Sequence, residues 1–414
     1  MADAPTAAAT ADIVRCELVI AGGGLVGLTL GIACASAGLA VAVIDREAPP
    51  VTVEEGFDGR SSAIAFGSQR ALAGIGLWQH IAPEAEPIRE IRVADGDSPL
   101  FLHYDHAELG DDPLGWIVEN RVLRLALFAR AAALPNLRHL APATVASAER
   151  GPTGVTVRLE DGRELRGYLL VAAEGRLSPL RKAAGIRTVE WRYKQIGIVC
   201  TVAHEVPHLG IAVEHFLPAG PFAILPMTGN RSSIVWTERA DLAPRMMALD
   251  DAEFLAELGR RFGDYLGRLT IAGPRWSYPL SLMHAEAYTA PRLALVGDAA
   301  HVIHPIAGQG LNLGLRDVPA LAELIVDARR LGLDIGNPAL LARYERWRRF
   351  DNTLLAAVTD GLNRLFSNDV APIAALRDAG LAVVNRLPPV KRFLMRHAMG
   401  LVGDLPRLVK GERL

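Results

Sequence analysis

Residues 17–45 read ELVIAGGGLVGLTLGIACASAGLAVAVID, and this stretch decides the fold class. Three successive glycines, Gly22 to Gly24, interrupt the apolar run. We therefore expect a buried strand over 17–21, a tight turn, a helix over 25–37 and a second strand over 39–45. Short strands that are apolar on both faces are typical of a parallel sheet covered by helices.

The turn carries the pattern G-x-G-x-x-G at Gly22, Gly24 and Gly27. Gly22 permits the turn, Gly24 lets the backbone approach a pyrophosphate, and Gly27 lets helix and strand pack closely. The helix N-terminus stabilises the phosphate charge. Asp45 ends the second strand, where a carboxylate can hold the hydroxyls of an adenosine ribose. A solvated acid at a strand end is the alternative interpretation of Asp45.

A membrane-spanning helix is the competing interpretation of the same stretch. No charged side chain lies between Leu18 and Ile44, which is long enough to cross a bilayer. However, the glycines at 22–24 would break such a helix near its start. We therefore favour strand, turn, helix and strand. Residues 1–15 have neither the basic leader nor the apolar core of a signal peptide.

The composition excludes several classes of protein. The chain has 414 residues, of which 50% are hydrophobic and 22% charged, so we expect two or three packed units with a sizeable core. Lys and Arg (44) nearly balance Asp and Glu (46), which argues against a strongly basic nucleic-acid binder. Three cysteines without a C-x-x-C pair exclude a disulfide framework, a cysteine zinc site and a dithiol redox centre.

A second glycine-rich segment, residues 293–317, reads LALVGDAAHVIHPIAGQGLNLGLRD. It begins as a buried strand that ends at Asp298, whose carboxylate can accept hydrogen bonds from the ribityl chain of a flavin. Gly308 and Gly310 leave backbone N–H groups free at the start of a helix that continues from Leu311. Those donors would stabilise negative charge on the N1–C2=O edge of a reduced flavin. Pro319 predicts a kink or a restart in this helix.

The order of these elements resembles a known family. The turn at 22–27, Glu174-Gly175 and Gly297-Asp298 are similar to the class A flavoprotein monooxygenases, such as para-hydroxybenzoate hydroxylase. The run 304–317 matches the signature of the ubiquinone-biosynthesis hydroxylases of that superfamily at every fixed position. Residues 216–226 (FLPAGPFAILP) resemble the family's middle region, as do Val235-Trp236, and the similarity extends over roughly 17–411.

The resemblance implies tightly bound, non-covalent FAD. The adenosine diphosphate would be held by Gly22, Gly24, Gly27 and Asp45, with Arg46 beside the adenine or ribose. The ribityl chain would be held by Asp298, and the isoalloxazine ring bordered by Pro305, Gly308, Gly310, Leu311 and Asn312. Further expected contacts are Arg60, Asn120, Arg124 and Glu174. Glu174 is one methylene longer than the family's usual aspartate, and Asp45 stands where many relatives carry glutamate.

The predicted fold is α/β, with a three-layer Rossmann-like FAD domain, an inserted mostly β substrate domain and a helical C-terminus. The FAD domain is discontinuous and takes residues 1–80, 105–185 and 280–360. The substrate domain takes 81–104 and 186–279, and the C-terminal helical region takes 361–414.

By resemblance, the chain hydroxylates the ring of a polyprenylated phenol in ubiquinone biosynthesis. NAD(P)H would reduce the FAD, and a flavin C4a-hydroperoxide formed with O2 would deliver oxygen to the ring. This chemistry needs no protein nucleophile, and the sequence identifies no catalytic residue or base. Two alternatives are an FAD-dependent reductase or dehydrogenase on the same fold, and a non-catalytic FAD-binding subunit of a biosynthetic complex.

Two pairs of residues, one of histidines and one of aromatic residues, have competing interpretations. His301 and His304 could suggest a metal, but no carboxylate or cysteine joins them at ligand spacing, so we expect no metal site. Phe222 and Trp236 either line a substrate pocket or belong to the sheet core.

The C-terminal tail is basic. Residues 376–414 carry a net charge of about +5, which leaves about −7 on residues 1–375. Phe393 and Leu394 lie among its basic residues. Residues 388–414 form either a membrane-surface helix or a helix docked on the core. We expect a cytoplasmic protein, peripheral on the inner face of the membrane in the first case. Other ubiquinone-biosynthesis proteins are expected partners, and nucleic acid is not.

Overall fold

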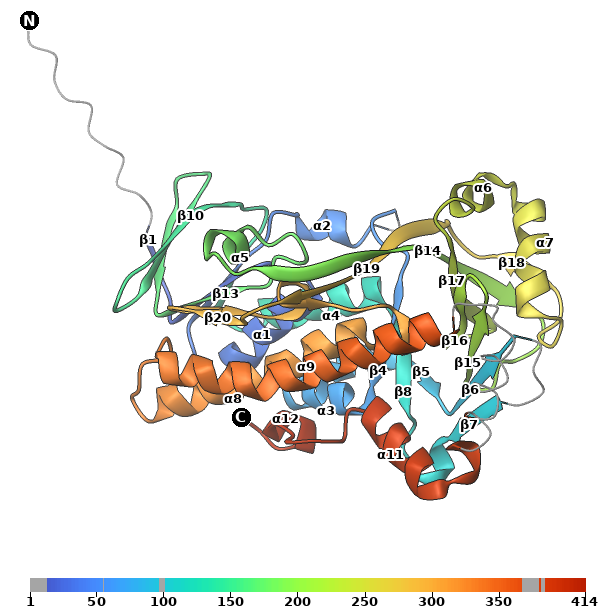
Figure 1. Cartoon of the computed structure of the whole chain (residues 1–414). Coiled ribbons are helices and arrows are strands. Elements are labelled where there is room, and N and C mark those ends of the chain that lie inside the picture. The colour runs from blue at the N-terminus through green and yellow to red at the C-terminus, as the bar shows by residue number, and fades with distance from the viewer. Residues whose placement is uncertain (1–12, 55, 97–100, 367–379, 381–383) are drawn as a thin grey trace, which may run out of the picture.

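A parallel sheet lies at the centre of the computed structural model, which describes residues 13–54, 56–96, 101–366, 380 and 384–414 (Figure 1). Its strand order is β20-β21-β13-β2-β3-β9, and all neighbours are parallel except β20 and β21. The strands are β2 (Leu18–Ala21), β3 (Val41–Ile44), β9 (Leu137–Leu140), β13 (Leu169–Ala172), β20 (Thr289–Ala290) and β21 (Leu293–Leu295). β2, β3, β13 and β21 are buried at every residue, as their apolar sequences require.

Two further layers cover this sheet. Figure 1 shows helices below it and a second sheet, of order β1-β12-β11-β10, above it. One hydrophobic core joins all three layers, with Leu30, Ile20 and Val157 each fully buried. The helices are α1 (Leu25–Ser36), α4 (Asn120–Ala132), α8 (Gln309–Arg330) and α9 (Pro338–Phe366), and the strands are β1 (Ile13–Arg15), β10 (Val145–Arg150), β11 (Val155–Leu159) and β12 (Glu164–Gly167).

The strand, turn, helix and strand predicted over 17–45 are confirmed as β2, α1 and β3. Within the described part of the chain, no helix is long and apolar enough to cross a membrane. The expected restart at Pro319 is wrong, because α8 runs through this residue without interruption. Packing of α8 against α1 outweighs the one backbone hydrogen bond that a proline removes.

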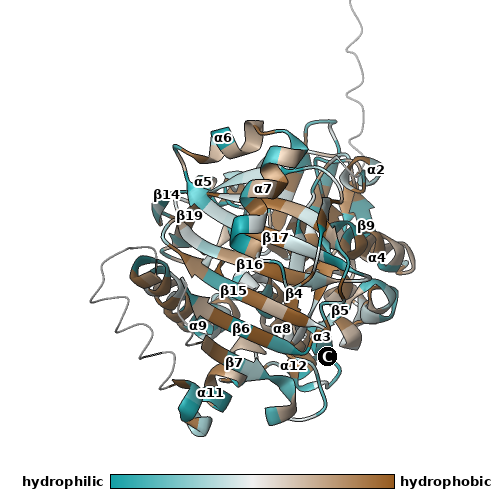
Figure 2. Ribbon diagram, turned by 90° about the vertical axis from the view of Figure 1, so that its right-hand side faces the viewer, coloured by the Kyte–Doolittle hydropathy of each residue, from teal (hydrophilic) through white to brown (hydrophobic). Residues whose placement is uncertain are grey.

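A nine-stranded sheet forms the second large unit. Its order is β22-β19-β14-β17-β16-β15-β6-β7, with β18 paired to β14. Figure 2 shows α6 (Ala243–Ala248) and α7 (Asp251–Phe262) across its outer face. The strands are β6 (Glu90–Asp95), β7 (Phe101–Asp105), β14 (Thr188–His204), β15 (Ile211–Leu217), β16 (Gly220–Met227), β17 (Arg231–Arg239), β18 (Leu269–Ile271), β19 (Trp276–Ala285) and β22 (His301–Val302).

Phe222 and Trp236 belong to the core of this sheet. Both are buried in a cluster with Phe254 of α7, and the Trp236 and Phe254 ring centroids are 5.7 Å apart. Of the two interpretations of these aromatics, the sheet core is therefore correct.

The remaining elements connect the two units. A small sheet of order β4-β8-β5 consists of β4 (Ser61–Ala65), β8 (Gly115–Glu119) and β5 (Glu86–Ile88). Short helices are α2 (Pro49–Thr52), α3 (Phe66–Gly74), α5 (Pro179–Ala183), α11 (Pro388–Ala398) and α12 (Arg407–Lys410). β22 follows the parallel strand β21 along the chain yet pairs with β19, so segment 293–317 lies at the junction of the two large sheets. The exact domain boundaries stay a prediction, and parts of 1–80, 81–104 and 361–414 fall outside the described residues.

Candidate functional site

The glycine turn before α1 is built by close backbone contacts. Gly22 has a φ of +103°, and a Cβ there would lie 2.2 Å from the Ala173 carbonyl oxygen. A Cβ on Gly27 would lie 1.9 Å from the Gly22 carbonyl oxygen. Gly24 is the N-cap of α1, has no atom within 4 Å of such a Cβ, and α1 has no side-chain cap. The helix start is thus open, with backbone donors free for an anion.

Asp45 is part of this turn. Its Oδ2 accepts a hydrogen bond from the Gly23 N–H at 2.6 Å, and its Oδ1 accepts one from the Glu47 N–H at 2.9 Å. Asp45 is half-buried and stabilises the glycine turn, and its contact with a ribose stays a prediction. Arg46, by contrast, is 80% exposed and pairs only with Glu47, at 3.3 Å, among the interactions seen in the described chain.

His139 of β9 is a residue of this turn that sequence reasoning missed. Its Nε2 would lie 3.0 Å from a Cβ on Gly23, and it is buried without a hydrogen-bond partner in the described structure. Burial lowers the pKa of His139, against the opposing charge of Asp45. No sequence signal marks this residue, because β9 reaches the turn only through the strand order of the sheet.

Three predicted contacts gather around one carboxylate, that of Asp58. Arg60 donates from Nε to Asp58 Oδ1 at 2.8 Å, and Asn120 and Arg124 donate to Oδ2 at 3.0 and 2.7 Å. Burial alone would raise the pKa of Asp58, but these partners hold it far below its usual range. Asp58 fixes the three side chains. The only feature of the sequence that indicated this role was its proximity to Arg60.

Asp298 is accessible although the residues beside it are buried. Gly297, Ala299 and Ala300 are all buried, whereas the Asp298 side chain is exposed. Desolvation nevertheless raises the pKa of Asp298, against the charges of His301, Arg60 and Arg176. We define the Asp298 recess as the surroundings of this carboxylate, which solvent reaches and which the protein nevertheless desolvates. The Asp58 cluster adjoins it, since the charge of Asp298 also acts on Arg60.

The recess adjoins the glycine turn. A Cβ on Gly297 would lie 3.2 Å from Val26 Cγ2, and one on Gly314 would lie 2.6 Å from the same atom. Val26 stands in the first turn of α1. Residues 22–27 and 297–314 therefore meet, although about 270 residues separate them in the chain.

The start of α8 is the second open helix N-terminus. Gly308 has a φ of +61°, α8 has no side-chain cap, and nothing lies within 4 Å of a Cβ on Gly310. Asn312 is fully buried, and its Oδ1 accepts from the Ala65 N–H and Ser68 Oγ, both at 2.9 Å. This side chain holds α8 against β4 and α3, so its backbone is the part left to border a flavin.

Pro305, Leu311 and Glu174 differ in their settings. Pro305 precedes a short helical turn at Ile306–Gly308, and Leu311 packs on the main core. Glu174 Oε2 accepts from Ser178 Oγ at 2.7 Å and from the Leu180 N–H at 3.2 Å. Burial raises the pKa of Glu174 against these bonds. Its carboxylate thus stabilises the start of α5, and a cofactor contact for it stays a prediction.

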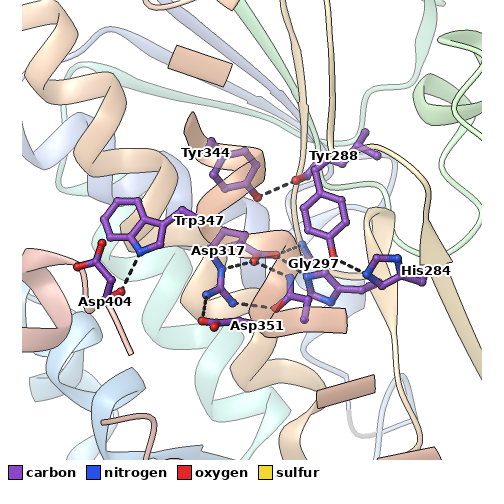
Figure 3. Close-up of polar contacts among 12 residues, drawn as sticks. His284, Tyr288, Gly297, Asp317, Tyr344, Trp347, Asp351 and Asp404 are labelled. Carbon is purple, nitrogen blue, oxygen red and sulfur yellow. Dashed lines mark hydrogen bonds and ion pairs between the residues drawn. The ribbon is translucent and has the colours of Figure 1, made fainter. Parts of the chain in front are cut away.

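Asp317 holds the turn that carries Asp298 (Figure 3). Its Oδ2 accepts from the Gly297 N–H at 3.0 Å and lies 2.6 Å from His301 Nε2, while Oδ1 accepts from Arg348 Nε at 2.9 Å. Burial would raise the pKa of Asp317, but His301 and Arg348 lower it below its usual value. His301 is therefore a hydrogen-bond partner of Asp317, and the described residues contain no cluster of three metal-ligating groups.

Open helix N-termini, a recessed carboxylate and closely packed glycines fit a dinucleotide that carries a flavin. The phosphates suit the α1 terminus, a polyol suits Asp298, and an anionic ring edge suits the α8 terminus. Desolvation raises the pKa of Cys16, Cys34 and Cys200 to about 12, so none supplies a thiolate at neutral pH.

Comparisons with known proteins agree with this geometry. The family model described as "FAD binding domain" matches residues 15–353. Ubiquinone hydroxylase UbiL of Rhodospirillum rubrum is 55% identical, over 96% of this chain and 93% of its own. The 3-demethoxyubiquinol 3-hydroxylase of Escherichia coli is 35% identical, over 93% and 98%. The crystal structure of p-nitrophenol 4-monooxygenase PnpA from Pseudomonas putida covers 95% of this chain and 99% of its own, with a TM-score of 0.80 and 20% identity, and shows the shared fold.

Proposed function

Because the chain belongs to the FAD-binding-domain family, together with the ubiquinone hydroxylases, we propose that it is an FAD-dependent aromatic-ring monooxygenase of ubiquinone biosynthesis. Its substrate is a polyprenylated phenol, and its co-substrates are O2 and NAD(P)H. The observation that carries the proposal is the meeting of the open α1 terminus, the open α8 terminus and the recessed Asp298 at one place.

FAD, when bound, supplies the redox chemistry and the activation of O2. Gly22 and Gly27 shape the turn through close backbone contacts, Gly24 would let the backbone approach the pyrophosphate, and Asp45 and Arg46 would lie at the adenosine end. Asp298 would accept hydrogen bonds from the ribityl chain, and the backbone of 305–312 would border the ring. The Asp58 cluster holds Arg60 beside the recess, where its charge balances Asp298.

The substrate-side contribution of the protein is to orient the phenol and to exclude water from the ring. Phe216 of β15 and Ile306 of the 305–308 loop pack in one buried cluster with Phe366 of α9. This cluster packs the nine-stranded sheet against the loop that would border the ring. Water exclusion favours oxygen transfer to the substrate over release of H2O2.

The test is turnover by purified protein. The FAD-loaded protein is incubated with NADPH, O2 and a panel of geranylated phenols that differ in their ring substituents, and products are analysed by mass spectrometry. We expect one oxygen atom from 18O2 in the product. Product that forms without O2 would support the reductase alternative, and bound flavin that no phenol and reductant turn over would support a non-catalytic subunit.

We also propose a membrane surface as partner, through α11 and α9. Val390 and Phe393 of α11 are 43% and 56% exposed beside the exposed Arg392. α9 exposes a stripe made of Phe350, Leu354, Val358 and Leu365. Apolar side chains flanked by basic ones suit an anionic lipid surface. Such a surface would give a lipid-soluble phenol a short route to the enzyme.

Deletion of 388–414 cannot test the membrane proposal, because Met395, Met399, Leu408 and Val409 of this region are buried in the core. The better variant is Phe393→Ser, tested by sedimentation with vesicles of phosphatidylglycerol and phosphatidylcholine. Binding should fall, and it should fall further with added salt. Leu177→Ser is the control, since Leu177 is 72% exposed and lies between β13 and α5. Equal binding by both variants would contradict the assignment of α11.

A further inference from the structure

Glu214 lies on the face of β15 that is turned toward the loop bordering the proposed flavin ring. Alternate residues of a strand share a face. Phe216, two residues on, packs with Ile306 of that loop, and Ala212, two residues back, packs with Phe66 of α3. Val213 and Leu217 pack instead on the cluster under α7. Glu214 is therefore directed away from α7 and into the region between the sheet and the FAD unit.

The immediate neighbours of Glu214 on this face are apolar. Its cross-strand partners are Val93 on β6 and Ala223 on β16. No charged side chain of β16 faces it, since Pro221 and Leu225 are the adjacent residues on that side. Ile306 and the other residues of the 305–308 loop are uncharged.

The titratable groups nearest this face are few. Asp95 of β6 is buried opposite Phe216, and Tyr104 of β7 lies opposite Ile91, its pKa raised to about 12 by burial. On the helices packed nearby, Arg364 of α9 pairs with Asp360 and Lys391 of α11 pairs with Glu108. His304, just before the loop, is fully buried against Tyr193, and burial lowers its pKa to about 4.

Glu214 itself has no hydrogen-bond or ion-pair partner in the described part of the chain, and solvent can reach part of it. Desolvation raises the pKa of Glu214 to about 7. A carboxylate that pairs with nothing and is costly to ionise does not contribute to stability. A carboxylate that changes charge near neutral pH is, however, well matched to accept a proton.

We propose that Glu214 is the base that accepts the phenolic proton of the substrate. In this step the O–H bond of the phenol breaks, the proton moves to the Glu214 carboxylate, and the electron pair stays on the phenolate oxygen. No electrons are gained or lost. The phenolate donates electron density into the ring, and the ring therefore reacts more readily, as the nucleophile, with electrophilic oxygen. The assignment rests on the proposed function, because it takes a phenol as the substrate.

The first test needs no turnover. A geranylated 4-nitrophenol is bound to the FAD-loaded protein, and the phenolate absorbance is recorded between pH 5 and 9. With the wild type, ionisation of the bound phenol should depend on pH near 7. Glu214→Gln should still bind the probe, and the pKa of the bound phenol should be at least one unit higher than in the wild type. An identical titration in both proteins would overturn the proposal, even if hydroxylation were never detected.

The second test is kinetic. Glu214→Gln should keep its flavin content and lose at least tenfold in the rate of phenol hydroxylation, with NADPH oxidation diverted to H2O2. The wild-type inflection near pH 7 in this rate should disappear. Glu214→Asp keeps a carboxylate and should retain the inflection at a lower rate. Glu149→Gln, on the exposed strand β10, is the control and should match the wild type. An inflection that persists in Glu214→Gln would overturn the proposal, whereas failure of every protein to hydroxylate would count against the proposed function alone.

Discussion

Gly24 and Gly27 are both glycines, but a different physical requirement excludes a side chain at each position. A Cβ on Gly27 would lie 1.9 Å from a backbone oxygen, whereas one on Gly24 would meet open space. Gly27→Ala should therefore destabilise the protein by about 3 kcal/mol or more, since backbone must move. Gly24→Ala should cost only about 1 kcal/mol as a poorer N-cap, yet weaken FAD binding at least tenfold. Urea unfolding and FAD titration of the apoprotein measure the two effects. Unchanged FAD affinity in Gly24→Ala would contradict a phosphate at this position.

Asp317 is predicted to stabilise both the fold and the cofactor turn. Asp317→Asn leaves Arg348 buried without its main counter-charge, and this should cost about 3–5 kcal/mol in the free energy of unfolding. The purified variant should also carry less FAD, because the Gly297 N–H loses its carboxylate acceptor. Asp351→Asn is the matched control, since Asp351 pairs with the same arginine at 3.0 Å but is 41% exposed. We expect it to lose about 1 kcal/mol or less.

We predict that Glu214 lowers the free energy of unfolding in a pH-dependent way. Its pKa rises from 4.5 to about 7 on folding, so between these values the unfolded chain releases the proton first. The folded state therefore loses stability as the pH rises from 4.5 to 7, and the penalty is constant above that. Glu214→Gln should be more stable than the wild type at pH 8 by about 3 kcal/mol, and equal to it at pH 4. A difference independent of pH would show that Glu214 does not titrate in this range.

At the residue scale, the sequence predicted positions whose chemistry is local. Gly22, Gly24 and Gly27 are specified by one turn, and Asp298 by one strand end. The partners of Asp58 and Asp317 could not be predicted, because Asn120 and Arg348 come from helices far along the chain. The structural role of the buried Asn312 side chain also could not be predicted, because its hydrogen-bond partners lie on β4 and α3.

At the scale of elements, the apolar pattern of the sequence predicted α1, because this helix buries one continuous stretch from Gly27 to Ala35. It could not decide how α11 sits, since a basic amphipathic helix suits both lipid and a protein core. The structure shows that α11 docks, with Met395 1% exposed and Lys391 paired with Glu108. Its other face remains open at Val390 and Phe393. The two interpretations of the tail are therefore compatible, because they concern opposite faces of one helix.

This division of α11 gives a prediction about its stability. Met395→Ala removes a buried side chain from the cluster shared with Phe66 and Met399, and it should cost about 2–5 kcal/mol. Phe393→Ala removes a side chain that is 56% exposed, and it should cost about 0.5 kcal/mol or less. Denaturant unfolding of the two variants measures this difference. Comparable losses would show that the docked face of α11 has been assigned wrongly.

At the scale of the whole molecule, the site is assembled from segments that belong to different sheets. The proposed adenosine end of the site lies at the ends of β2 and β3 of the parallel sheet, and the proposed flavin end lies at α8 and at β22 of the nine-stranded sheet. Long-range assembly of this kind cannot be read from any one motif. It follows from the strand order, which places β21 one strand away from β2, from the packing of Gly297 and Gly314 on Val26, and from the pairing of β22 with β19.

The assembly predicts how the molecule responds to loss of its cofactor and to cofactor fragments. Free FAD at 1,000 times its Kd should stabilise the apoprotein by about 4 kcal/mol, seen as a rise of several degrees in Tm. ADP should give a smaller rise through the α1 end, and riboflavin 5′-phosphate a smaller rise through the α8 end. Asp298→Ala should be largely colourless and should lose the response to riboflavin 5′-phosphate while keeping the response to ADP; Gly24→Ala should do the reverse. If both variants lost both responses, the two ends would not be separate contacts, and the division of the site between α1 and α8 would be wrong.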